Sequence, residues 1–153
     1  MKSNSTIKSN WSAKPGVWFS IVAIISLLWN IIGALQFVNS LTTTEASMKG
    51  AMMTPEQVLV ITSLPSWVTF AFGVGVVTSL LGSVLLYLRH RFAKPTFLVS
   101  LLAFVLLTVG YANYGVFAAL GTQQIAVMST VVVVAAILVM LSRKIDSLKN
   151  TKR

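Results

Sequence analysis

The sequence predicts an all-α membrane protein, built as a four-transmembrane-helix bundle with both termini in the cytoplasm. The chain is 56% hydrophobic and only 10% charged, whereas soluble domains carry about 25% charged residues. All Lys and Arg residues except Lys49 fall in three short segments that alternate with four apolar runs. Because basic residues are enriched in cytoplasmic loops, this alternation places both ends and the middle connection on the cytoplasmic side.

Each apolar run approaches or exceeds the ~20 residues that a helix needs to cross the hydrocarbon core. None of the runs contains Asp, Glu, Lys, Arg or His. In lipid their backbone polar groups must be satisfied internally, which favours helices. The predicted spans cover about 17–38, 67–88, 95–118 and 124–141. Residues 17–142 therefore form the membrane domain, between basic cytoplasmic tails at 1–16 and 143–153.

The connection between the first two spans contains a helix-start pattern. Thr54 suits the N-cap, Pro55 suits the first helical position, and Gln57 follows three residues after the cap. The sequence therefore predicts a short external amphipathic helix that runs through about Thr62. Its apolar residues 58–61 favour a position against the bilayer surface or the end of the bundle.

The last two spans are joined by an uncharged external connection near residues 113–124. Gly121 is suited to close one helix, and Thr122 is suited to cap the next. Because the connection is short, the two helices are expected to be antiparallel neighbours. The first apolar run exceeds the 7–15-residue core of a signal peptide, so it is expected to be a retained span.

The composition argues against several classes of function. The formal charge of +9 suggests nucleic-acid binding, but the basic residues flank membrane spans rather than gathering on one folded face. The chain has no Cys, which excludes thiolate metal sites and Cys nucleophiles. His90 lies among three cations without other candidate ligands. We therefore expect no nucleic-acid partner, no metal site and no cofactor.

Catalysis is also disfavoured, because titratable groups must converge in one site. Glu45 and Glu56 are predicted outside, whereas His90 and Asp146 are predicted inside. No catalytic residue is therefore assigned, and the chain is not expected to be an enzyme. Proton-coupled transport is disfavoured as well, because it normally uses an intramembrane Asp, Glu or His and the four apolar runs contain none. Uncoupled passage of a small neutral solute remains open, through an oligomer, because four helices leave little room for a pore.

The first span has a polar side. At 100° per residue, one arc of about 120° gathers Ser26, Trp29, Asn30, Gly33, Gln36, Phe37 and Ser40. Asn30 lies near the predicted bilayer centre, where an amide needs a partner, usually on another helix. Trp29 is far from the interfaces that tryptophan prefers. These residues either fasten the bundle or line a small polar pocket formed by Trp29, Asn30 and Gln36.

The second span has a ridge of small residues at spacing four, which we call the small-residue ridge: Ala71, Gly75, Ser79 and Ser83. Small residues allow membrane helices to approach closely, so that dispersion and weak Cα–H bonds act between them. The ridge is therefore predicted to be a packing surface. The sequence leaves open whether it packs within one chain or between chains.

Several short motifs, taken in order, resemble an uncharacterised family of small four-helix bacterial inner-membrane proteins that is sometimes labelled "sugar transporter". The motifs are Leu28-Trp29-Asn30-x-x-Gly33-x-x-x-Phe37, Thr54-Pro55-Glu56, Pro65-x-Trp67 with Ala71-Phe72, Leu88-Arg89-x-Arg91, and Ser100-Leu101-Leu102. The resemblance covers about residues 25–140. It implies a four-helix membrane fold with an external amphipathic segment. The transporter label implies no mechanism that can be placed on these residues.

Two hypotheses of function follow. The first is an interaction or accessory subunit of the inner membrane, with the small-residue ridge as its interface and Asn30 as a polar fastener. The second is a transporter or channel for a small neutral solute, which uses the polar side of the first span and acts as an oligomer. The expected partners are the lipid bilayer and either a second copy of the chain or another membrane protein.

Overall fold

The computed structural model describes residues 17–88 and 90–150, with side chains described over 20–88 and 90–143. This part of the chain is helical and contains no strand. The helices are α1 (Val17–Thr42), α2 (Glu45–Gly50), α3 (Pro55–Thr62), α4 (Ser66–Tyr87), α5 (Ala93–Asn113) and α6 (Val116–Asn150). In the described part, α1, α4, α5 and α6 are long and apolar enough to cross a membrane. The prediction of an all-α protein with four membrane-length helices is confirmed; the tail 1–16 lies outside the described residues.

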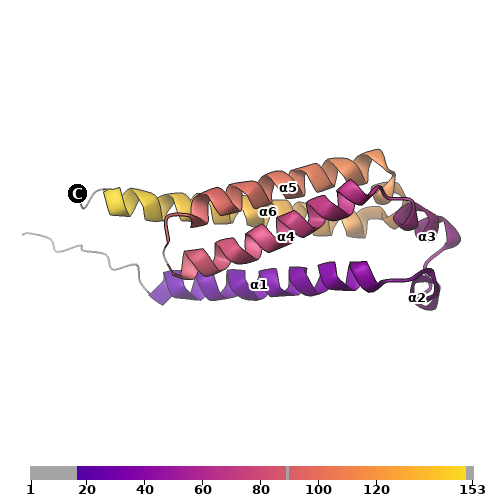
Figure 1. Ribbon diagram of the computed structural model, residues 1–153, viewed down its shortest axis with the longest axis horizontal. Helices are drawn as coiled ribbons and strands as arrows, with labels where there is room; N and C mark the ends of the chain where they lie inside the picture. Colours follow the sequence, from indigo (N-terminus) through magenta and orange to yellow (C-terminus); the bar gives the residue numbers. More distant parts are fainter. Residues whose placement is uncertain (1–16, 89, 151–153) are drawn as a thin grey trace, which may run out of the picture.

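The four long helices run along the long axis of the molecule, and consecutive ones are joined at alternate ends (Figure 1). The short helices α2 and α3 lie together at one end, which we call the capped end. The opposite end carries the α4–α5 connection and the C-terminal end of α6, and includes Arg91, Lys94 and Arg143. We call it the basic end.

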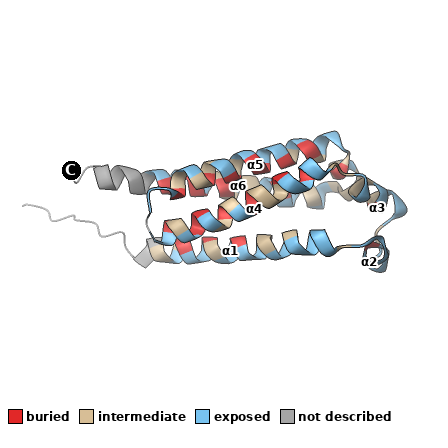
Figure 2. Ribbon diagram, in the orientation of Figure 1, coloured by how far each residue is buried: buried red, intermediate tan, exposed pale blue. Residues whose placement is uncertain are grey.

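The packing of the long helices is uneven. Helix α4 packs extensively on α5 and also on α1, while α6 packs on α5. Over the described residues, α1 packs closely on α4 alone among the long helices. Buried positions are accordingly frequent on α4 and α5, whereas most of α1 is exposed (Figure 2). The bundle is therefore closed along α4–α5 and open between α1 and α6.

The α4–α5 interface is close because aromatic rings lie against glycines. A Cβ atom added to Gly75 would lie 2.8 Å from Phe104 Cε1, and one added to Gly82 would lie 2.9 Å from the Phe97 ring. Ser100 Oγ also donates a hydrogen bond of 2.9 Å to the carbonyl oxygen of Gly75. Each ring occupies the space that a side chain would take, so the two backbones approach closely.

The connection between the last two long helices differs from the expected one. Helix α5 ends at Asn113 rather than near residue 118. The turn lies at Gly115, whose φ of 72° suits glycine. Gly121, with φ 71° and ψ −160°, interrupts α6. It therefore ends a short segment over 116–120 rather than the third span, because the chain has already turned at Gly115.

Helix α3 has the predicted start. Thr54 Oγ1 accepts a hydrogen bond of 3.3 Å from the backbone N–H of Gln57, and the Gln57 side chain accepts one of 3.0 Å from that of Thr54. Gln57 Nε2 donates a further bond of 3.0 Å to the carbonyl oxygen of Ala119, so this side chain tethers α3 to the start of α6.

Helix α2 was not predicted. Its capping box is formed by Thr44 and Ser47, and Ser at the third position is a weaker sequence signal than Glu or Gln.

Candidate functional site

Asn30 is the centre of a buried polar cluster between α1 and α4. Its Nδ2 atom donates hydrogen bonds of 2.8 Å to the carbonyl oxygen of Ser26 and to Ser83 Oγ. The hydroxyls of Ser26 and Ser83 lie 2.9 Å apart, and Ser83 Oγ donates to the carbonyl oxygen of Ser79 at 3.1 Å. All four residues are at most 6% exposed. Asn30 is thus held to the small-residue ridge of α4.

The small-residue ridge is buried within the chain along its whole length. Gly75 contacts Phe104 and Ser100 of α5, and Ser83 contacts Asn30 and Ser26 of α1. The ridge therefore packs against two helices of the same chain. It does not provide a free surface for a second protein.

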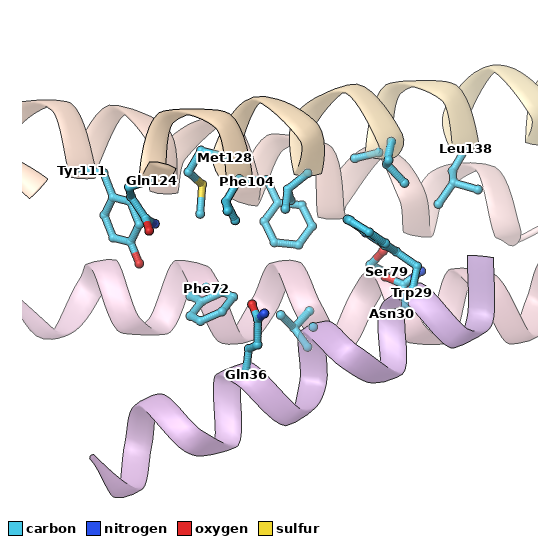
Figure 3. A pocket seen from close by; sticks show the side chains of 16 residues that line it. Trp29, Asn30, Gln36, Phe72, Ser79, Phe104, Tyr111, Gln124, Met128 and Leu138 are labelled. Atoms are coloured by element: carbon cyan, nitrogen blue, oxygen red, sulfur yellow. The ribbon is translucent and has the colours of Figure 1, made fainter. Parts of the chain in front are cut away.

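A cavity of about 190 Å³ lies between the four long helices. Its lining includes Trp29, Asn30, Gln36, Ser79, Tyr111 and Gln124, together with apolar and aromatic side chains such as Phe104 and Met128. In Figure 3, Tyr111 and Gln124 lie toward one end, Gln36 projects from α1 nearer the middle, and Trp29 and Asn30 lie toward the other end. We call this space the central cavity. Amide and hydroxyl groups from different helices meet in it.

A larger space of about 630 Å³, which we call the vestibule, lies at the capped end. Side chains from α1, α2, α3, α5 and α6 line it, among them Asn39, Ser40 and Ser47. Gln36, Tyr111 and Gln124 line both the vestibule and the central cavity. The two spaces therefore adjoin at these three side chains.

The side of the bundle between α1 and α6 is also hollowed. One groove of about 340 Å³ is lined by residues that include Trp29, Gln36 and Thr130. A second groove of about 190 Å³ lies nearer the basic end and is lined by aliphatic side chains together with Ser26 and Trp29. Trp29 lines both grooves and the central cavity, and its side chain remains 41% exposed.

The polar side of α1 divides between packing and lining. Ser26 and Asn30 are hydrogen-bonded to α4, and Asn30 also lines the central cavity together with Trp29, Gly33 and Gln36. A Cβ atom added to Gly33 would meet nothing within 4 Å.

Phe37 lies against Gly73 and makes an edge-on contact with Phe72, with ring centroids 5.3 Å apart. Ser40 lines the vestibule. The helical arc thus contains residues with three different surroundings.

Sequence reasoning missed the contribution of α5 and α6 to the central cavity. The sequence assigned no role in a binding site to Tyr111, and it placed residue 124 only at the start of the fourth predicted span. Their proximity to Gln36 depends on how three helices pack, which no periodicity within one helix reports. Gln124, an uncharged polar residue at the start of an apolar run, was the one signal of this cavity that the sequence offered.

Comparisons with protein-family models, with curated proteins and with solved structures give no match. The site must therefore be interpreted from its own chemistry. Among the described residues, no charged side chain lines the central cavity or the vestibule. Likewise, the described part contains no group of three His, Asp or Glu side chains arranged to hold a metal ion. The arrangement can donate and accept hydrogen bonds and can stack an aromatic ring.

Proposed function

We propose that this protein is a non-enzymatic, multi-pass protein of the bacterial inner membrane that binds a small neutral polar solute and, as an oligomer, transports it without ion coupling. The observation that supports this proposal is the junction of the vestibule and the central cavity at Gln36, Tyr111 and Gln124. On this proposal, a solute moves from the capped end past these three side chains toward Asn30.

The chemistry of the lining suits an uncharged ligand. The amides of Gln36 and Gln124 and the Tyr111 hydroxyl can both donate and accept, so they match solute hydroxyl or amide groups. Asn30 Nδ2 already donates to Ser26 and Ser83, so Asn30 offers its side-chain oxygen as an acceptor. A volume of 190 Å³ corresponds to about six water molecules at ~30 Å³ each. The solute class is therefore a compact molecule with a few polar groups, such as a polyol or a small amide.

The orientation that accompanies this proposal places the capped end outside and both termini in the cytoplasm. The capped end carries Glu45, Lys49 and Glu56, whereas the basic end carries Arg91, Lys94 and Arg143, and the positive-inside rule favours the latter in the cytoplasm. Reporter fusions after Ser47 should report the exterior, and fusions at the C-terminus should report the cytoplasm. A cytoplasmic signal at Ser47 would reverse the direction of entry.

Uptake by proteoliposomes tests the proposal. Permeability to glycerol and to urea is measured by light scattering for wild type, Gln124→Ala and Gln36→Ala. Gln123→Ala is the matched control, because Gln123 is exposed and lines none of the described cavities. We expect the first two substitutions to change permeability and the control to leave it at the wild-type level. Equal permeability of protein-containing and empty vesicles would reject the transporter proposal.

The interaction-subunit hypothesis is less well supported by the geometry. Its proposed interface, the small-residue ridge, is covered by α5 and α1. A partner would have to use another surface, and no described contact singles one out. Binding of a solute is therefore the proposal that more of the site's polar side chains support.

A further inference from the structure

We infer that the solute is a flat ring that carries lactam groups (–NH–CO–) at its edge, such as a pyrimidine base, and that it binds where the central cavity meets the vestibule. This inference rests on the proposed function and narrows the class of solute. Three features of the site support it: unpaired carboxamides, aromatic rings held in place by their neighbours, and a volume that suits a single ring.

The polar side chains at the junction are not used by the fold. Among the described residues, no hydrogen bond involves the side chain of Gln36, Tyr111 or Gln124. Asn30 differs, because its Nδ2 atom already donates to α1 and α4. An amide inside a membrane bundle needs a partner, so the carboxamides of Gln36 and Gln124 are available to a ligand.

A carboxamide recognises a lactam through two parallel hydrogen bonds. Its N–H donates to the lactam oxygen and its oxygen accepts from the lactam N–H, which is how Asn and Gln bind the edges of bases at two points. In Figure 3, Gln36 and Gln124 project from helices on opposite sides of the cavity. A pyrimidine such as uracil has two lactam edges, so one ring can pair with both carboxamides. A single hydroxyl of a polyol lacks this paired donor and acceptor.

Aromatic rings of the central cavity are held by neighbours outside it. Phe104 lies against Gly75, and Phe72 makes its edge-on contact with Phe37. Rings that are already fixed lose little freedom when a ligand binds. Hydroxyls of a polyol would be left unpaired against these apolar faces, which costs free energy. A lactam ring instead keeps its polar groups at its edge and presents flat faces that aromatic rings can stack on.

The central cavity has the size of one six-membered ring. Its volume of about 190 Å³ exceeds the ~150 Å³ of an aliphatic cavity that takes up benzene. A pyrimidine base has the ring size of benzene and adds only small exocyclic groups. Over the described residues no charged side chain lines the cavity, so a neutral ring is favoured over an ionised one.

Equilibrium binding tests the solute class without requiring transport. The full chain is placed in lipid nanodiscs, and binding of radiolabelled uracil is measured by dialysis against empty nanodiscs as background. The competitors are dimethyluracil, methylated on both ring nitrogens, and inositol, a neutral polyol ring. We expect each to compete at least tenfold less well than unlabelled uracil, because a two-point pair contributes roughly this factor. Equal competition by dimethyluracil, or no saturable uracil binding, would overturn the inference.

Substitutions then locate the site. Gln36→Ala and Gln124→Ala should each weaken uracil binding roughly tenfold, whereas Gln123→Ala should leave it unchanged. Phe72→Leu should weaken it severalfold through lost stacking. Its matched control is Phe70→Leu, because Phe70 is 73% exposed on the same helix and lines none of the described cavities.

The pattern of results separates the two proposals. Wild-type affinity in both glutamine variants would overturn the inference, and the competition experiment on wild type decides it even if a variant does not fold. Permeability to glycerol or urea without uracil binding would reject the inference alone. Uracil binding by a protein that does not raise permeability would reject the transporter proposal alone.

Discussion

The α4–α5 interface and the side between α1 and α6 show two ways in which membrane helices can lie together. At the first, glycines of α4 receive aromatic rings of α5. At the second, bulky residues such as Trp29, Val131 and Ile137 face the gap, and cavities remain between the helices. Lipid tails are as apolar as Leu, so apolar side chains alone do not draw two membrane helices together. The difference indicates that the α4–α5 pair is the closely packed part of the bundle, whereas the α1–α6 side is the loosely packed part.

The largest expected effect on stability comes from a substitution in the closely packed α4–α5 interface. Gly82→Ala places a methyl group about 2.9 Å from the ring of Phe97, which is fully buried and cannot move into free space. Overpacking of this kind typically destabilises by about 1–3 kcal/mol. The free energy of unfolding, measured by titration with a denaturing detergent, should fall by this order.

The matched control is Gly33→Ala on the open side. A Cβ atom there meets nothing within 4 Å, and alanine is a better helix former than glycine by roughly 0.5–1 kcal/mol. The variant should therefore be as stable as wild type or slightly more stable. If both alanines destabilise equally, the two sides do not differ in packing as the structure indicates.

A smaller effect on stability is expected at the contact between α1 and α4. Asn30→Ala removes the amide that donates to Ser83 Oγ and to the carbonyl oxygen of Ser26. Hydrogen bonds between membrane helices average about 0.6 kcal/mol, with a maximum near 1.7 kcal/mol. A double-mutant cycle of Asn30→Ala and Ser83→Ala, measured as free energy of unfolding, should give a coupling energy within this range.

The same cycle separates fastening from ligand binding. If the coupling is present and solute permeability is unchanged in Asn30→Ala, the residue acts only as a fastener. Additive effects of the two substitutions would mean that the pair contributes no joint stability, despite the 2.8 Å distance between Asn30 Nδ2 and Ser83 Oγ.

Features within a single helix could be predicted, whereas features between helices could not. The absence of charge marked the four long helices, and Thr54, Pro55 and Gln57 marked the start of α3, because each signal lies in consecutive residues. Asn30 stood out because an amide in an apolar run needs a partner. Its partner Ser83 is 53 residues away, and the joining of Gln36 with Tyr111 and Gln124 requires three helices to be positioned. Periodicity carries no information on that arrangement.

The third prediction concerns the capped end and has the smallest effect. Gln57→Ala removes the hydrogen bond from Gln57 Nε2 to the carbonyl oxygen of Ala119 and the side-chain half of the α3 capping box. Both bonds lie at the end of the bundle, so the loss should be near the lower bound of about 0.5–1.5 kcal/mol for a net hydrogen bond. Hydrogen exchange should become faster in α3, where the tether is lost, and stay unchanged in α4 and α5.

Glu56→Ala is the control, because Glu56 is exposed and its side chain makes no described hydrogen bond. Faster exchange throughout α4 and α5 would show that the closely packed part depends on the cap, whereas a local change would show that the closed side holds its structure independently of the vestibule.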